Sequence, residues 1–88
     1  MTYLVSFKPS FFKDLERLPP EIRGRIVLMI EQIKRDPFAV AAKRLSGQKQ
    51  LYRYRYGDYR LIYYVGQKEH KTLFLFVGHR KEIYRSLK

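Results

Sequence analysis

A segment of alternating residues, LYRYRYGDYRLIYYV at positions 51–65, limits the fold of this chain more than any other feature. Tyrosine and arginine alternate with period two in its first half, which is the side-chain period of a β-strand. Gly57-Asp58 then provides a two-residue turn, because glycine takes positive φ without steric strain. The segment therefore predicts an antiparallel hairpin of two strands, over residues 51–56 and 59–65.

The short turn also predicts which residues lie opposite one another. It places Arg55 opposite Arg60, with Arg53 two residues away on the same face, which we call the arginine face (Arg53, Arg55 and Arg60). Like charges in opposite positions repel, and a surface that keeps this repulsion is typical of phosphate binding. Arginines that discourage strand aggregation are the alternative. We expect this face to be open to solvent, because burying unpaired guanidinium groups is costly.

The rest of the chain completes one α+β domain over residues 1–88. Apolar patterns predict two more strands and two amphipathic helices, over residues 3–7, 72–77, 11–18 and 21–34. Pro19-Pro20 separates the two helices, and a short terminal helix is expected after Gly78. The predicted order is β-α-α-β-β-β with a short C-terminal helix. The helical hairpin is expected to pack on one face of a mostly antiparallel sheet, against the tyrosines opposite the arginine face.

The charge of the chain indicates a polyanionic partner. Its net charge of +11 creates a strong electrostatic field around a chain of only 88 residues. Residues 1–42 hold seven basic and five acidic residues, for +2, whereas residues 43–88 hold twelve basic and three acidic residues, for +9. The excess therefore lies with the arginine face, although a basic surface also serves solubility.

Several kinds of site are missing from the sequence. There is no cysteine, and the two histidines, His70 and His79, do not have a zinc-site spacing. No closely spaced acidic pair suits Mg²⁺, and no glycine-rich phosphate loop or serine motif is present. We expect no metal and no cofactor, so catalysis would use cations and proton transfer. That chemistry suits RNA, which supplies its own 2′-OH nucleophile. No membrane segment or secretory signal is visible, so a cytoplasmic protein is expected.

The residues that follow the last predicted strand add further chemistry. His79, Arg80, Lys81 and Tyr84 begin where that strand leaves the sheet, so this tail is expected to lie over the arginine face. Histidine titrates near neutral pH and transfers protons, and tyrosine stacks on bases. A surface histidine and a packing tyrosine are the commoner roles of such residues when they stand alone. Their convergence with the arginines is what favours function.

The hairpin segment LSGQKQLYRYRYGDYRLIYYV and the ending VGHRKEIYRSL, together with the proline-linked helices, resemble the RelE/ParE superfamily of toxins over the whole chain. The resemblance is greater to its RelE-type ribonuclease branch. It implies the toxin of a type II toxin–antitoxin system, a ribosome-dependent, metal-free endoribonuclease. Such an enzyme cuts mRNA in the ribosomal A site, beside the 16S rRNA. The substrate 2′-OH attacks the adjacent phosphate and leaves a 2′,3′-cyclic phosphate and a 5′-OH.

The resemblance also implies roles for individual residues. Arg60 and Arg80 would hold the scissile phosphate, and Tyr84 would stack or donate a hydrogen bond. The residues implied to bind RNA are Arg53, Arg55, Lys49 and Lys81. The family pattern has lysines at the positions of Arg53 and Arg55, and arginine is a poor general base. His79 is therefore assigned acid–base work.

The resemblance further implies a cognate antitoxin, RelB-like, whose acidic segment would cover the basic surface. Operator DNA would be bound only through that antitoxin, and no membrane partner is expected. Two alternatives remain open. One is a ParE-like toxin that inhibits DNA gyrase without cutting RNA, and the other is a noncatalytic module that binds RNA or the ribosome.

Overall fold

The computed structural model describes residues 3–38, 40, 42–45 and 50–86, apart from the side chains of Tyr84 and Ser86. The elements follow one another as β1 (Leu4–Phe7), α1 (Phe11–Glu16), α2 (Pro20–Arg35), β2 (Ala42–Arg44), β3 (Leu51–Tyr56), β4 (Tyr59–Gly66), β5 (Lys71–His79) and α3 (Arg80–Ser86). This order confirms the predicted α+β class. It adds one strand, β2, that the sequence patterns did not indicate.

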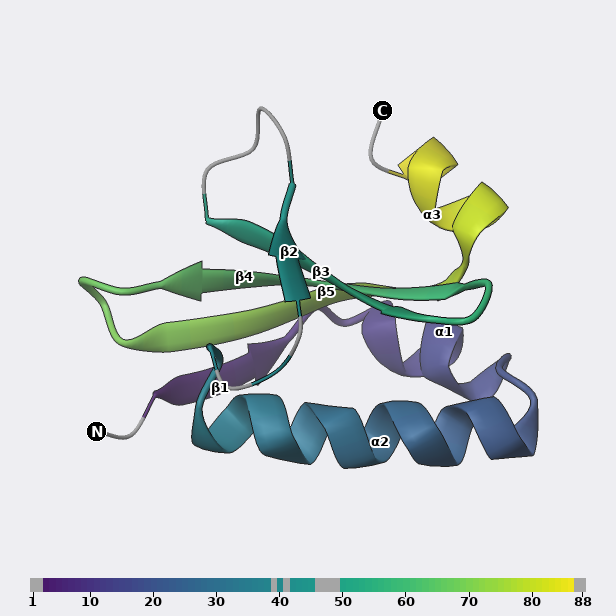
Figure 1. Ribbon diagram of the computed structural model, residues 1–88, viewed down its shortest axis with the longest axis horizontal. Coiled ribbons are helices and arrows are strands. Elements are labelled where there is room, and N and C mark those ends of the chain that lie inside the picture. Colours follow the sequence, from purple (N-terminus) through teal and green to yellow (C-terminus); the bar gives the residue numbers. More distant parts are fainter. Residues whose placement is uncertain (1–2, 39, 41, 46–49, 87–88) are drawn as a thin grey trace.

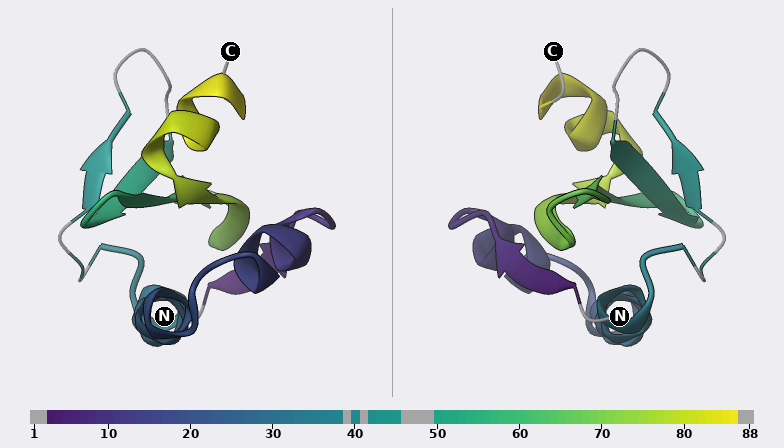
Figure 2. Two further views of the ribbon diagram at one scale, coloured as in Figure 1. Left: turned by 90° about the vertical axis from the view of Figure 1, so that its right-hand side faces the viewer. Right: turned by 90° about the vertical axis from the view of Figure 1, so that its left-hand side faces the viewer.

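The strands form a single sheet in the order β1-β5-β4-β3-β2. β1 pairs in parallel with β5, and the other neighbours are antiparallel, so the sheet is mostly antiparallel as expected. Helices α1 and α2 lie on one side of the sheet, whereas α3 lies on the other (Figure 1). The end-on views in Figure 2 show the same separation of α2 from α3.

The hairpin of β3 and β4 has the predicted register. Arg55 lies opposite Arg60, and Tyr56 lies opposite Tyr59. Gly57 in the turn has φ of 58°, the left-handed conformation that glycine adopts readily. The turn chemistry and the alternation of residues therefore place the arginines on one face.

The hydrophobic core lies between the helical hairpin and the tyrosine side of the sheet. α2 begins at Pro20, where a missing N–H costs nothing, and it buries residues spaced by three and four. The core residues of the helices are Phe11, Leu18, Ile26, Met29, Ile30 and Ile33, and those of the sheet are Tyr54, Leu61, Tyr63, Val65, Phe74 and Val77. The predicted packing of the helices on this face is confirmed.

The prediction that the opposite face of the sheet is open to solvent is wrong for the part that α3 covers. Ile62 of β4 and Ile83 of α3 are both buried, because α3 folds back over β4 and β5. Ile83 packs close to Gly78 of β5, at ordinary van der Waals distance from where a Cβ would stand. The sequence ending contains the apolar residue for this contact, but the alternation in the hairpin predicts that its partner on the sheet, Ile62, is exposed. The half of the face beside the hairpin turn is therefore partly covered.

Tyr63 supports a prediction about stability. Its ring is fully buried, and its hydroxyl has no hydrogen-bond partner among the described residues. Burial raises the pKa of the Tyr63 phenol above its usual value. An unfolded chain ionises this tyrosine above about pH 10, while the folded chain keeps it neutral, so stability falls as pH rises above about 10.

We expect Tyr63→Phe to raise the free energy of unfolding by about 1 kcal/mol at neutral pH, because an unpaired buried hydroxyl is removed. The variant should also lose less stability than the parent chain near pH 11. Urea denaturation at the two pH values measures both effects. Tyr56→Phe is the matched control, because the Tyr56 ring is exposed and its change should be neutral. A Tyr63→Phe variant less stable than the parent would contradict the prediction.

Candidate nucleic-acid interface

The site is built where the β3–β4 turn meets the start of α3. Arg55 comes from β3 and is exposed, Arg60 comes from β4, and Arg80 is the first residue of α3. Arg60 pairs across the sheet with Gly78, two residues before Arg80. Three neighbouring segments of the fold therefore bring these guanidinium groups to one corner of the sheet.

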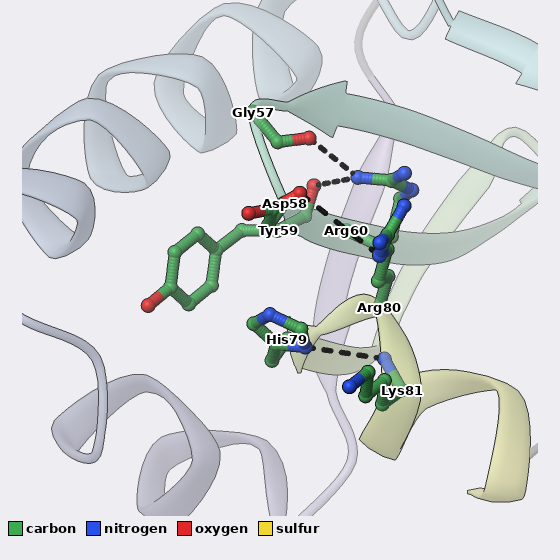
Figure 3. A network of polar contacts seen from close by, with 7 residues as sticks. All are labelled: Gly57, Asp58, Tyr59, Arg60, His79, Arg80 and Lys81. Atoms are coloured by element: carbon green, nitrogen blue, oxygen red, sulfur yellow. Dashed lines mark hydrogen bonds and ion pairs between the residues drawn. The ribbon is translucent and has the colours of Figure 1, made fainter.

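Arg60 is the buried cation of this corner, with only 5% of its surface exposed. Its Nη1 donates hydrogen bonds to the carbonyl oxygens of Gly57 and Tyr59, at 2.8 and 2.9 Å (Figure 3). Its Nε has no partner among the described residues. The expectation that all arginines of this face are solvent-exposed is wrong here, because carbonyl groups of the turn replace part of the water around the guanidinium.

Arg80 is tied to the hairpin turn through Asp58. The Arg80 backbone N–H donates to the Asp58 carbonyl oxygen at 2.8 Å, and Arg80 Nε lies 3.9 Å from Asp58 Oδ1. The two side chains are 52% and 65% exposed, so their ion pair contributes little energy. The contact orients Arg80 and leaves its guanidinium group able to bind an anion.

Strand β2 contributes a cation that the sequence patterns missed. Lys43 lies opposite Arg53 in the antiparallel pairing of β2 with β3. Side chains in opposite positions share a face, so Lys43 extends the arginine face by one strand. Three residues are too few to show an alternation, which is why β2 had no signal of its own. The basic surface thus reaches from α3 across β4 and β3 to β2.

His79 does not join the arginines. It pairs with Tyr59 across β5 and β4, and their rings meet edge to face with centroids 5.7 Å apart. Tyr59 packs against the core side of the sheet, so the His79 ring lies on that side, away from Arg60 (Figure 3). The expected position of this ring over the arginine face is wrong, because alternation along β5 carries residue 79 to the opposite face from residue 78.

The His79 ring borders a cavity of about 170 Å³ at the edge of β5. β1 pairs only with residues 71–74, so among the described residues the later part of β5 has a strand beside it on the β4 side alone. α1 and the start of α3 flank this position. The polar and aromatic residues of the wall are Asp14, Arg17, Tyr59, His79 and Glu82.

The remaining candidate residues are Lys81, Tyr84 and Lys49, and the structure describes the side chain of Lys81 alone among them. Lys81 is exposed in the first turn of α3, and its backbone N–H donates to His79 Nδ1 at 3.3 Å. Tyr84 lies in α3, but its side chain is outside the described part, and Lys49 lies outside it altogether. The described residues contain no cluster of three potential metal ligands. In the same part of the chain, no helix is long and apolar enough to cross a membrane.

Comparison with known proteins identifies the family. Residues 5–84 match a family described as the ParE toxin of the type II toxin–antitoxin system parDE. The chain belongs to this family. The toxin is 36% identical to toxin RelE3 of Methanocaldococcus jannaschii, with 91% of this chain and 93% of the relative covered. It is 31% identical to toxin RelG of Mycobacterium tuberculosis, with 97% and 99% covered.

A solved relative agrees with the sequence matches. The toxin superposes on a RelB–RelE antitoxin–toxin complex from Methanococcus jannaschii with a TM-score of 0.77 and 33% identity. That match covers 93% of this toxin and 98% of the solved chain. Membership of the RelE/ParE superfamily, expected from the hairpin and the chain ending, is therefore confirmed.

Proposed function

We propose that this toxin is an endoribonuclease that cuts mRNA in the ribosomal A site and uses the substrate 2′-OH as its nucleophile. One observation carries the proposal. Arg55 and Arg60 lie directly opposite each other, and Arg80 joins them at the same corner of the sheet. Such a cluster costs repulsion in the free protein, and a phosphate group bound between the side chains removes that cost.

The arginines would stabilise the charge that develops on the phosphate. In the reaction, the 2′ oxygen bonds to phosphorus while the bond from phosphorus to the 5′ oxygen breaks. The 2′-OH loses a proton, and the leaving 5′ oxygen gains one. Arg60 is the strongest candidate for stabilising the transition state, because its charge is shielded from water. Arg80 would bind the same phosphate.

Proton transfer in this reaction is not assigned to His79. His79 faces the cavity beside Tyr59, so the proposal gives it no contact with the reacting phosphate. Tyr84 keeps the role that the family resemblance implies. Arg53, Arg55 and Lys81 would hold the neighbouring backbone, and Lys43 would join them from β2. Lys49 retains its proposed contact with RNA.

The proposed partners follow from charge. Residues 43–88 carry the larger share of the net charge of +11, which suits contact with mRNA and 16S rRNA. The solved relative from Methanococcus jannaschii is bound to its antitoxin RelB. That complex supports a RelB-like antitoxin whose acidic segment neutralises the basic surface here. Operator DNA would then be reached only through the antitoxin.

Cleavage of ribosome-bound mRNA tests the proposal. Purified toxin is added to programmed ribosomes, and breaks are mapped by primer extension. We expect Arg55→Ala and Arg80→Ala to lower the cleavage rate by about 100-fold or more each, because each removes a cation from the phosphate. Arg35→Ala is the matched control, since Arg35 is exposed on α2, on the other side of the sheet. Intact transcripts with the parent toxin would refute the proposal.

Gyrase inhibition is the second candidate, because the matched family is described as a ParE toxin. A supercoiling assay with DNA gyrase distinguishes the two functions. Inhibition of supercoiling without RNA cleavage would favour the gyrase function. Salt-sensitive binding to ribosomes without any cleavage product would favour a noncatalytic module.

A further inference from the structure

The cavity beside His79 has the mixed chemistry of a site that recognises a planar polar ring. Tyr59 provides an aromatic surface on which such a ring can stack. Asp14 offers carboxylate acceptors, and Arg17 offers guanidinium donors. Neither side chain has a hydrogen-bond or ion-pair partner among the described residues. The wall therefore presents donors and acceptors that are available to a ligand.

His79 adds a donor to this wall. Its Nδ1 accepts a hydrogen bond from the Lys81 backbone N–H at 3.3 Å. In the neutral ring the other nitrogen, Nε2, then carries the proton and donates. A nucleobase displays both donors and acceptors on its edge, which matches a wall of this kind. A phosphate does not suit it, because the carboxylates of Asp14 and Glu82 both border the space.

The size of the cavity limits which base it holds. Its volume is about 170 Å³. A protein cavity of about 150 Å³ holds one benzene molecule, so this space fits a single six-membered ring. The two fused rings of a purine are larger, so part of a purine would project from the open side of this space. The volume therefore favours cytosine or uracil over adenine or guanine.

The cavity adjoins the arginine corner of the sheet through Gly78 and His79. Gly78 borders it and at the same time pairs with Arg60 across the sheet. His79 borders it and is followed directly by Arg80, which faces the other side. An RNA strand held by its phosphate at Arg80 would therefore bring its next base toward the edge of β5, which the cavity borders.

We propose that this cavity binds one pyrimidine base next to the phosphate held by the arginines, and so sets a sequence preference for the cut. Asp14 and His79 are the specificity-determining residues, with Tyr59 as the stacking surface. The inference rests on the proposed nuclease function. It adds to that function a site for one base, on the side of β5 opposite the reacting phosphate.

Titration of isotope-labelled toxin with cytidine 5′-monophosphate tests the cavity directly by NMR. We expect the ring signals of His79 and Tyr59 to shift, while inorganic phosphate alone leaves them in place. Adenosine 5′-monophosphate should bind at least about fivefold more weakly, because its base is too large. Asp14→Asn should weaken cytidine 5′-monophosphate at least about tenfold, whereas Glu16→Gln, a matched change on the exposed side of α1, should not.

The outcomes separate this inference from the nuclease function. Ring shifts produced equally by phosphate, equal binding of the two nucleotides, or an unchanged affinity in Asp14→Asn would each overturn the cavity proposal. RNA cleavage is scored in the separate ribosome assay. Cleavage of RNA without ring shifts would refute the base site and leave the nuclease function standing. Ring shifts in a toxin that cuts no RNA would support the base site and refute the nuclease function.

Discussion

Replacing Arg60 with methionine is expected to lower RNA cleavage by about 100-fold or more, while the free energy of unfolding falls by less than about 1 kcal/mol. The two effects differ because Arg60 is a buried cation placed opposite a second cation, Arg55. Its removal loses two hydrogen bonds to turn carbonyls, which water can replace at the exposed Gly57. The removal also relieves desolvation and repulsion, and methionine fills most of the volume.

The neighbouring residue provides the control for Arg60→Met. Leu61 is fully buried on the core side of the same strand, and Leu61→Ala should cost about 2–5 kcal/mol. Urea denaturation measures both variants, and primer extension on ribosome-bound mRNA measures the cleavage. A loss of stability in Arg60→Met as large as that in Leu61→Ala would show that Arg60 serves the fold rather than the phosphate.

Phe11→Ala is expected to destabilise the toxin by about 3–5 kcal/mol, the largest effect on stability that we predict. Phe11 is fully buried and joins α1 to the sheet through its ring contacts with Phe7 and Phe74, whose centroids lie 5.6 and 6.0 Å away. A domain of 88 residues has a free energy of unfolding of about 4–13 kcal/mol, so this change removes a large part of it.

The adjacent residue is a control of the same chemistry for Phe11→Ala. Phe12 is 51% exposed, so Phe12→Ala should cost less than about 1.5 kcal/mol. The midpoints of urea denaturation curves compare the two variants at an unchanged slope. Equal losses from the two phenylalanines would mean that α1 packs on the sheet through its other face.

The hairpin could be predicted from sequence because the residues that determine it are adjacent in the chain. A two-residue turn at Gly57-Asp58 leaves one register, and that register alone places Arg55 opposite Arg60. The core side of α2 was readable for the same reason, since its apolar residues recur at helical spacing. Neither prediction depended on contacts with the rest of the chain.

The arrangement around the site could not be read in this way, because it depends on contacts between distant segments. Arg60 is buried in a sheet over which α3 folds back, and the turn supplies its carbonyl partners. The side of β5 on which His79 lies depends on the pairing with β4. β2 exists only as a partner of β3 and has no periodic pattern of its own. These details decide which candidate residues meet.

The parallel pairing of β1 with β5 has a consequence for how the toxin is made. Leu4, near the start of the chain, pairs with Lys71, near its end, so the sheet cannot close until the last strand has emerged during synthesis. Arg80 follows that strand and emerges later still. The arginines of β3, β4 and α3 therefore meet only after β5 and α3 have both been made, and a nascent chain that lacks them has no assembled site.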